Sequence, residues 1–369
     1  MVRKPAAPRK SASTKPKQPP KAKATAPAAP VSPRPPSFNP PQPTFPTQLR
    51  LLDVFARTFA GELSAADRDD ILQQIKGDLY NRDFAAAFGR EERLATYAAR
   101  WSPTRALCYA SIFNGLEEQL SRVSKGIGEK GVDHQPKGEH ADRPHLKVVS
   151  VGGGAAELAS LATFLGSSQV SAGEIILVDS GPWASVVDRL HHGLTTPPPL
   201  PSSASAAATA SNKPFLAPDA MKTYFHQHDI LSLDGDSLGR LLGPSPVVVT
   251  LLFTLNELYT SGGIGRTTGF LLNLGERLAP GSLLLVVDSP GSYAEAEVGS
   301  ASKRYPMRWL LEHTLLTTAA GTWERLETCD SVWFRLADSL RYPMALENMR
   351  YQLHLYRAVG PSNPTGRVE

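Results

Sequence analysis

Residues 146–165, LKVVSVGGGAAELASLATFL, contain the pattern that decides the fold. The stretch from Leu146 to Val151 is a short apolar run typical of a buried strand, and three glycines follow it directly. The residues after the glycines, up to Leu165, space their apolar side chains as a helix does. A strand, a glycine turn and a helix in this order predict the first unit of an α/β sheet.

Three further apolar runs each end in a polar residue: residues 174–178 before Asp179, residues 247–255 before Asn256 and Glu257, and residues 283–287 before Asp288. Strands that alternate with helices in this way predict a doubly wound, mostly parallel sheet. Ligands of such sheets bind beyond the carboxyl ends of the strands. We therefore expect the glycine turn and the three polar strand ends to face one crevice.

The remaining segments predict the domain organisation. Residues 47–125 have helical spacing and predict a helical subdomain, in which Ser102-Pro103 separates two helices. Residues 126–144 are predicted to be a flexible linker, and residues 145–358 are predicted to be the main domain.

Within that main domain, residues 195–213 are a Pro-, Ala- and Ser-rich insertion that we expect to be dispensable. A helix is expected over residues 303–316. Residues 332–336 and 349–356 are expected to form an antiparallel pair that closes the sheet, and residues 359–369 form a C-terminal tail.

The charge of the chain is unevenly distributed. The 369 residues carry a net charge of +4, but residues 1–46 hold nine Lys or Arg, no acid and fourteen of the 32 prolines. Such a composition cannot bury enough apolar surface to offset the entropy of ordering, so residues 1–46 are predicted to be disordered. The tail is either a solubilising leader or a basic arm for nuclear import or RNA attraction, and composition leaves both open.

Composition also excludes several classes of protein. Two cysteines, Cys108 and Cys329, cannot form a disulfide framework or a Cys-rich zinc site, which favours a reducing intracellular compartment. No signal-peptide pattern is present, and the most apolar run, residues 246–255, is about half as long as a membrane helix. We expect a soluble protein without a membrane or metal partner.

The glycine turn discriminates between two kinds of cofactor. The dinucleotide fingerprint has glycine at positions one and three and glycine or alanine at position six. Gly152 and Gly154 fit it, Gly153 lies between them, and Glu157 occupies position six. A carboxylate there would repel a diphosphate, whereas it would attract the sulfonium and ammonium groups of S-adenosylmethionine. The charge therefore favours the methyl donor over a nicotinamide cofactor.

Two more acids are candidates for cofactor binding. Asp179 ends the second strand, where a carboxylate can accept both ribose hydroxyls of either cofactor class. Asp229 is placed to accept from an adenine amino group if residues 224–228 form the third strand. Trp183 is a candidate cover for the adenine face, although a tryptophan there is at least as often part of the core.

Several segments together resemble the fungal 25S ribosomal RNA uridine-N3 methyltransferase family. They are VSVGGGAAE (149–157), TLLFTLNELY (250–259), LAPGSLLLVVDSPGSY (278–293), RWSPTRAL (100–107) and LENMRYQLHLY (346–356). The resemblance covers most of residues 90–357. It implies a Rossmann-like class I methyltransferase fold, S-adenosylmethionine as cofactor, ribosomal RNA or a pre-ribosomal particle as partner, and N3 of a uridine as acceptor. The usual acid two residues before the first glycine is Ser150 here, and Glu157 is a candidate replacement.

Methylation of N3 of uracil requires a base that takes the proton from this nitrogen, or a charge that favours the deprotonated imidate. Asn256 and Glu257 follow the fourth strand, where the acceptor base of Rossmann-like methyltransferases lies. Asn256 is the candidate hydrogen-bond partner of the uracil edge, Glu257 the candidate base and Asp288 the second-choice base. The alternative is that Glu257 caps a helix and Asn256 shapes the turn.

Candidate RNA contacts lie near the predicted strand ends. They are the aromatic residues Tyr259, Tyr293 and Tyr305 for base stacking, and the cations Lys303 and Arg304 for phosphates. Packing in the core and a solvated helix face explain these residues almost as well.

Three classes of function remain: an RNA methyltransferase, a nicotinamide oxidoreductase and a noncatalytic ribosome-assembly factor. The RNA methyltransferase is favoured. We expect it to be a monomer and to be found in the nucleus, nucleolus and cytoplasm.

Overall fold

The computed structural model describes residues 38–126, 144–170, 172–298 and 301–360, without the side chains of residues 294–298 and 301–303. The predicted linker (126–144), most of the N-terminal tail and residues 361–369 therefore lie almost wholly outside the described residues. The described residues belong to one compact unit. In them, no helix is both long enough and apolar enough to cross a membrane.

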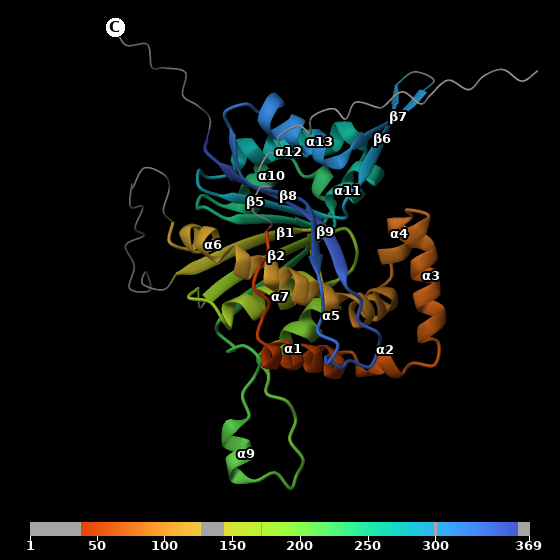
Figure 1. Cartoon of the computed structure of the whole chain (residues 1–369), viewed down its shortest axis with the longest axis vertical. Coiled ribbons are helices and arrows are strands. Elements are labelled where there is room, and N and C mark those ends of the chain that lie inside the picture. The colour runs from red at the N-terminus through yellow and green to blue at the C-terminus, as the bar shows by residue number, and fades with distance from the viewer. Residues whose placement is uncertain (1–37, 127–143, 171, 299–300, 361–369) are drawn as a thin grey trace, which may run out of the picture. The chain divides into compact units, whose positions relative to one another are not determined.

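A mixed sheet of seven strands forms the centre of this unit (Figure 1). Its strands are β1 (His145–Val151), β2 (Ala172–Asp179), β3 (Met221–Gln227), β4 (Val248–Leu252), β5 (Leu283–Asp288), β8 (Trp323–Phe334) and β9 (Met349–Ala358). They are ordered β3-β2-β1-β4-β5-β9-β8, and β1 to β5 are parallel. The direction of the chain connections reverses between β1 and β4, where ligands bind in such folds.

The C-terminal strands close the sheet as an antiparallel pair, as predicted. β9 pairs with β5 on one side and β8 on the other, both antiparallel. The dinucleotide-binding fold has a sixth parallel strand in the place of β9. The observed order is therefore that of a Rossmann-like sheet with an antiparallel ending.

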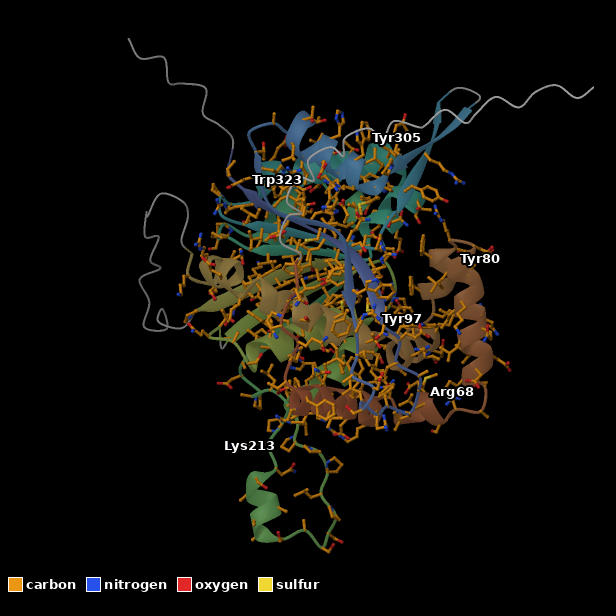
Figure 2. All side chains as sticks on the ribbon, viewed as in Figure 1. Arg68, Tyr80, Tyr97, Lys213, Tyr305 and Trp323 are labelled. Carbon is orange, nitrogen blue, oxygen red and sulfur yellow. The ribbon has the colours of Figure 1, made fainter. Side chains whose placement is uncertain are left out.

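Two layers of helices cover the sheet, because strand residues point alternately to opposite faces. On β1, Val148 belongs to one apolar cluster and Val149 to the other. The first layer contains α7 (Ala155–Leu165) and α8 (Ala184–Thr195). The second contains α10 (Gly235–Leu242), α12 (Gly263–Arg277) and α13 (Met307–Glu312). Figure 2 shows the packed side chains, with Tyr97 on the first side and Trp323 on the second.

The N-terminal helices extend the first layer. They are α1 (Phe45–Thr58), α2 (Ala60–Ser64), α3 (Arg68–Tyr80), α4 (Phe84–Phe88), α5 (Glu91–Gly115) and α6 (Glu117–Ser124). Phe55 of α1 and Leu107 of α5 are fully buried in the same cluster as Leu158 of α7. These helices therefore share their core with the sheet.

One prediction for this region is wrong: the chain does not break at Ser102-Pro103, because α5 continues through Pro103. Proline has no N–H to donate to the carbonyl four residues earlier, which belongs to Ala99. The Tyr342 hydroxyl donates to that carbonyl instead, at 2.6 Å. A hydrogen-bond donor that is distant in sequence thus satisfies the orphaned group and lets the helix continue.

The predicted tail boundary at residue 46 is also wrong. Residues 38–46 lie against the folded unit: Ser111 and Asn114 of α5 donate to the carbonyls of Pro40 and Pro41, at 3.2 and 3.3 Å. α1 already begins at Phe45, and Thr44 caps it. Proline carbonyls remain good hydrogen-bond acceptors, so a Pro-rich composition did not prevent ordering here.

The helix predicted over residues 303–316 is wrong in its first part. A hairpin of β6 (Tyr293–Val298) and β7 (Ala301–Pro306) precedes α13, and a π-helical turn over residues 313–318 follows α13. The residue before a proline is biased away from the helical conformation, and this applies to Tyr305 before Pro306.

The low-complexity insertion lies between α8 and β3. It contains the short helix α9 (Ala206–Ser211), which buries none of its residues and projects away from the sheet in Figure 1. A backbone hydrogen bond of 3.0 Å from Leu216 to Leu194 closes its base.

Candidate active site

The glycine turn after β1 requires glycine for steric reasons. Gly152 has φ +67°, a left-handed conformation, and its N–H donates to the Val178 carbonyl at 2.8 Å. A Cβ on Gly152 would lie 2.4 Å from the side chain of Thr254, and one on Gly153 would lie 2.5 Å from the Ser150 hydroxyl. The turn is therefore held tightly between the ends of β1, β2 and β4.

Glu157 and Trp183 fix the start of α7. The Gly154 N–H donates to Glu157 Oε2 at 2.8 Å, so this carboxylate caps the helix. Burial raises the pKa of Glu157 to about 7, and the backbone N–H of Gly154 opposes part of this rise. A Cβ on Gly154 would lie 3.0 Å from the indole of Trp183. Trp183 itself is buried in the core cluster and also lines the cavity described next.

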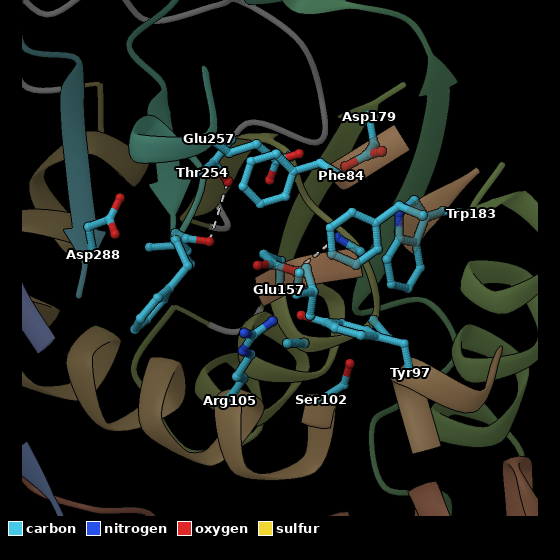
Figure 3. A pocket seen from close by; sticks show the side chains of 18 of the residues that line it. Phe84, Tyr97, Ser102, Arg105, Glu157, Asp179, Trp183, Thr254, Glu257 and Asp288 are labelled. Carbon is cyan, nitrogen blue, oxygen red and sulfur yellow. Dashed lines mark hydrogen bonds between the residues drawn. The ribbon is translucent and has the colours of Figure 1, made fainter. Parts of the chain in front are cut away.

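A cavity of about 190 Å³ opens beyond the carboxyl ends of β1, β2, β4 and β5. Figure 3 shows its polar groups, and α3, α4 and α5 supply the opposite wall with Leu79, Phe84, Phe88, Tyr97, Ser102 and Arg105. The predicted residues that line it are Gly152, Gly154, Glu157, Asp179, Asn256, Glu257 and Asp288. The predicted convergence of the strand ends on one crevice is thus found.

The carboxyl groups in this cavity are buried, and their pKa values are raised. Asp179 accepts from the Gly181 N–H at 2.7 Å, yet burial raises its pKa to about 6. Burial and the charge of Asp179 raise the pKa of Glu257 to about 8. Burial also raises the pKa of Asp288. The charge of Arg105 lowers the pKa values of Glu257 and Asp288, but burial has the larger effect.

Asp288 and Glu257 differ in their hydrogen bonds. Asp288 accepts from the backbone N–H groups of Asn256 and Ser289, at 3.0 and 2.7 Å, and from the Ser292 hydroxyl at 3.1 Å. Within the described part of the chain, the Glu257 carboxyl accepts no hydrogen bond. Asp288 thus holds the loop after β4, whereas Glu257 is available to a ligand.

Arg105 is the one cation among the described residues that line the cavity. Its guanidinium lies over the rings of Tyr97 and Phe253, at 5.2 and 5.5 Å. Phe253 has φ +61°, a strained conformation for a residue with a side chain. Four carboxyl groups against one guanidinium leave the cavity with an excess of negative charge once these groups ionise.

The polar groups that line the cavity fit S-adenosylmethionine better than a dinucleotide. The excess of carboxylates would attract a sulfonium and an ammonium group and repel a diphosphate. The Asn256 Oδ1 is buried without a hydrogen-bond partner in the described structure, which leaves one acceptor for a ligand. In the same residues, no group of three or more His, Cys, Asp or Glu has the arrangement of a metal site.

The structure does not bring Asp229 into this cavity. Its carboxylate accepts from the Leu231 N–H at 2.9 Å and pairs with Arg266 at 3.0 Å. The prediction that Asp229 contacts the adenine is therefore not supported, because the carboxylate is engaged in capping a short turn outside the lining residues.

The predicted RNA contacts lie outside the cavity. Tyr259 is 1% exposed and packs in the core, so its predicted role in base stacking is wrong. The ring of Tyr293 lies between the guanidinium groups of Arg82 and Arg304, at 5.1 and 4.6 Å. Tyr305 stacks on Trp309 with 5.5 Å between ring centroids. Lys303 lies in β7, and its side chain is outside the described residues.

Sequence reasoning assigned no place in the cavity to Arg105, Phe253, Thr254 or the aromatic wall from α4 and α5. The local sequence of Arg105 and Phe253 carries no signal that the two residues touch. The sequence indicated in two ways that this part of α5 matters: residues 100–107 resemble a methyltransferase family, and Arg100 and Arg105 are cations that could dock RNA beside the active site.

Comparisons with known proteins agree with this geometry. The profile of the family described as "Putative SAM-dependent methyltransferase" matches residues 55–357. The 25S rRNA (uridine(2843)-N(3))-methyltransferase of Saccharomyces cerevisiae is 31% identical over 345 residues, which cover 85% of this chain and 86% of the yeast protein.

Two solved structures are more distant. A SAM-dependent methyltransferase from Methanosarcina mazei is 13% identical, with a TM-score of 0.33 over 58% of this chain and 93% of the other. An O-methyltransferase family protein from Burkholderia thailandensis is 15% identical, with a TM-score of 0.34 over 81% of this chain and 74% of the other.

Proposed function

Because this chain belongs to the family of SAM-dependent methyltransferases, we propose that it methylates N3 of a uridine in large-subunit ribosomal RNA. One observation carries the choice of substrate: the alignment with the yeast uridine-N3 enzyme spans 85% of this chain and 86% of that enzyme. The family profile matches residues 55–357, which include the strand ends and the helical wall of the cavity as well as the sheet. A nicotinamide oxidoreductase is set aside by the family assignment.

The residues of the cavity have separate roles in this proposal. When bound, S-adenosylmethionine supplies a methyl group carried on a positively charged sulfur. Gly152, Gly154 and the carboxylates of Glu157 and Asp179 would hold the cofactor, since they line the cavity at the ends of β1 and β2. The aromatic wall of Phe84, Phe88 and Tyr97 would exclude water.

Glu257 is the proposed general base. Its carboxylate takes the proton from N3 of the uracil, which makes this nitrogen nucleophilic. A pKa of about 8, raised by burial and by Asp179, suits a group that must accept a proton near neutral pH. The open hydrogen-bonding capacity of this carboxyl distinguishes it from Asp288, whose oxygens already accept three hydrogen bonds.

Asn256 is the proposed orienting residue. Its Oδ1 is buried without a partner in the described structure, and its backbone N–H is fixed by Asp288 at 3.0 Å. The side-chain amide would bind the uracil edge: the unpaired Oδ1 would accept from an N–H, and the NH₂ group would donate to a carbonyl. Orientation of the base contributes to the rate because the reacting nitrogen must be aligned with the methyl group.

The direct test is transfer of labelled methyl from S-adenosylmethionine to deproteinised 25S ribosomal RNA that lacks N3-methyluridine, followed by nucleoside analysis. We expect the label in 3-methyluridine. Label in another nucleoside would contradict the choice of acceptor. RNA without label, from a protein that binds S-adenosylhomocysteine, would contradict the choice of substrate.

A further inference from the structure

A second cavity, of about 230 Å³, lies beside the first and shares Arg105 and Phe253 with it. Arg100 and Trp101 of α5 form one side, and Asn348 and Arg350 at the start of β9 form the other. The two sides come from the segments 100–107 and 346–356, which are far apart in sequence and have no role in the mechanism above.

The second cavity is predominantly basic. Three arginines and one carboxylate line it, and that carboxylate, Glu347, is paired with Arg100. Arg105 faces the carboxyl groups of the first cavity, whereas Arg350 has no acidic partner within the described residues. Arg350 donates only to the Ser331 hydroxyl, at 2.7 Å. The cavity therefore has one guanidinium group, that of Arg350, without an acidic neighbour, and this group suits an anionic ligand.

An exposed tryptophan adjoins this cavity. Trp333 of β8 is paired with Arg350 of β9, and its side chain is 52% exposed. The guanidinium groups of Arg335 and Arg350 lie 4.9 and 5.6 Å from the centre of its ring. A large exposed aromatic ring beside two cations matches the way proteins bind single-stranded nucleic acid, by stacking on bases and pairing with phosphates.

We propose that this surface, formed by Arg100, Trp101, Arg105, Trp333, Arg335 and Arg350, binds a single-stranded segment of the substrate RNA beside the target uridine. Trp333 stacks on a base, and Arg350 pairs with a phosphate. This inference rests on the proposed function, because the occupant is the substrate. An acidic peptide would need only the cations and would leave the exposed indole without a partner.

Two variants separate the two contacts. Binding of fluorescent oligouridylate is measured by anisotropy at several salt concentrations, with S-adenosylhomocysteine bound. Trp333→Ala is expected to weaken binding about tenfold or more while leaving the salt dependence unchanged. Arg350→Gln is expected to reduce the slope of log affinity against log salt by about 0.7, the value for one phosphate on a single strand.

Matched controls lie elsewhere in the molecule. Tyr224→Ala removes an aromatic ring of 46% exposure on β3, at the opposite edge of the sheet from β8. Arg240→Gln removes an exposed arginine of α10 that, like Arg350, hydrogen-bonds to a serine. Both controls are expected to bind oligouridylate as the unaltered protein does. Heparin, a polyanion without bases, is expected to bind the Trp333→Ala variant and the unaltered protein equally.

The outcomes separate this inference from the proposed function. Unchanged RNA affinity and salt slope in Trp333→Ala and Arg350→Gln would overturn the inference, while 3-methyluridine formation would still uphold the function. Loss of heparin binding with Trp333→Ala would show a general effect on the surface and also contradict it. If the unaltered protein bound S-adenosylhomocysteine but no oligouridylate, the proposed RNA surface would be rejected. Weakened binding in both variants without 3-methyluridine in the transfer assay would support the surface and refute the acceptor.

Discussion

Glu257 and Asp288 show how two carboxyl groups of one cavity can differ in use. Both are buried, and burial raises the pKa of each. Asp288 is bound by two backbone N–H groups and a hydroxyl, so its carboxylate is committed to the structure. Glu257 has a pKa of about 8 and no such bonds in the described structure, so protonation and deprotonation remain available to it.

Glu257→Gln is therefore expected to reduce methyl transfer by about 10²- to 10⁴-fold, the usual contribution of a general base. Cofactor binding should persist, because glutamine keeps the size of the side chain. Transfer rates and calorimetry with S-adenosylhomocysteine measure the two effects. Full transfer activity in this variant would remove Glu257 from the chemistry.

The pH profile gives a second readout of the same residue. A base acts only when deprotonated, so kcat/KM should rise with pH and level off above about 8, where Glu257 is ionised. Deprotonation of the uridine itself could also produce a rise. Glu257→Gln separates the two causes. If the rise of kcat/KM with pH persists unchanged in this variant, it is due to deprotonation of the uridine.

Gly152→Ala is expected to abolish cofactor binding and to lower stability. The new Cβ would lie 2.4 Å from the Thr254 side chain, and φ of +67° would strain any residue other than glycine. Gly269→Ala in α12 is the control, because a Cβ there meets no atom within 4 Å. That change should stabilise the protein by up to about 1 kcal/mol. Thermal denaturation with and without S-adenosylhomocysteine distinguishes the variants.

At the scale of elements, the sequence identified the central strands because their apolar runs are short and bounded by polar residues. Prediction from the sequence failed where a residue far away in the chain determines the local structure. α5 passes through Pro103, and the Ala99 carbonyl that the proline leaves without a donor accepts from Tyr342, which is 243 positions away. The segment before α13 was predicted to be helical but forms a hairpin. The spacing of apolar residues in a helix and in a short hairpin is hard to tell apart in a polar sequence.

The candidate site was predictable to a similar extent. Asp179, Glu257 and Asp288 follow strands, and the carboxyl ends of parallel strands must meet. Asp229 also follows a strand, yet Arg266 and a local turn engage its carboxylate. The contact between Arg105 and Phe253 joins a helix and a strand end far apart in sequence, and no local pattern encodes it.

Tyr342→Phe tests the passage of α5 through its proline. Removal of the hydroxyl leaves the Ala99 carbonyl without its donor, so the free energy of unfolding should fall by about 1 kcal/mol. The measurement is denaturant unfolding. Tyr80→Phe serves as the control, since Tyr80 is 89% exposed and its variant should match the unaltered protein. Equal stability of both variants would show that the hydroxyl is not needed.

Replacement of residues 198–212 by a short Gly-Ser turn tests the insertion. α9 buries nothing, and the hydrogen bond between Leu216 and Leu194 already closes the base of the insertion. We expect an unchanged or slightly higher free energy of unfolding, by about 0.6 kcal/mol for each halving of the loop. Thermal denaturation and methyl transfer are the measurements, and loss of either folding or transfer would assign the insertion a role.

For the whole molecule, the buried acids predict an unusual dependence of stability on pH. The pKa values of Glu157, Asp179 and Glu257 in the folded protein, about 7, 6 and 8, lie above those of exposed carboxyls. The folded state therefore binds more protons than the unfolded state between about pH 4 and 8. Stability is greatest at the acidic end of this range and is lost as pH rises through the folded pKa values.

Denaturant unfolding from pH 5 to 8.5 should show this loss, at up to about 1.4 kcal/mol per pH unit for each group. The affinity for S-adenosylmethionine relative to S-adenosylhomocysteine should rise over the same range, because only the former has the sulfonium charge that ionised carboxylates attract. Calorimetry with both ligands measures this ratio. A ratio that falls with pH would contradict the electrostatic account of the cavity.

The interior position of β9 has a consequence for synthesis of the protein. β9 lies between β5 and β8, yet it spans Met349–Ala358, close to the end of the described chain. A growing chain on the ribosome therefore exposes the hydrogen-bonding edges of both neighbours until residues 349–358 have been translated. Messages that terminate before residue 349 would yield fragments in which β5 and β8 lack their shared partner strand, and such fragments would be prone to aggregation.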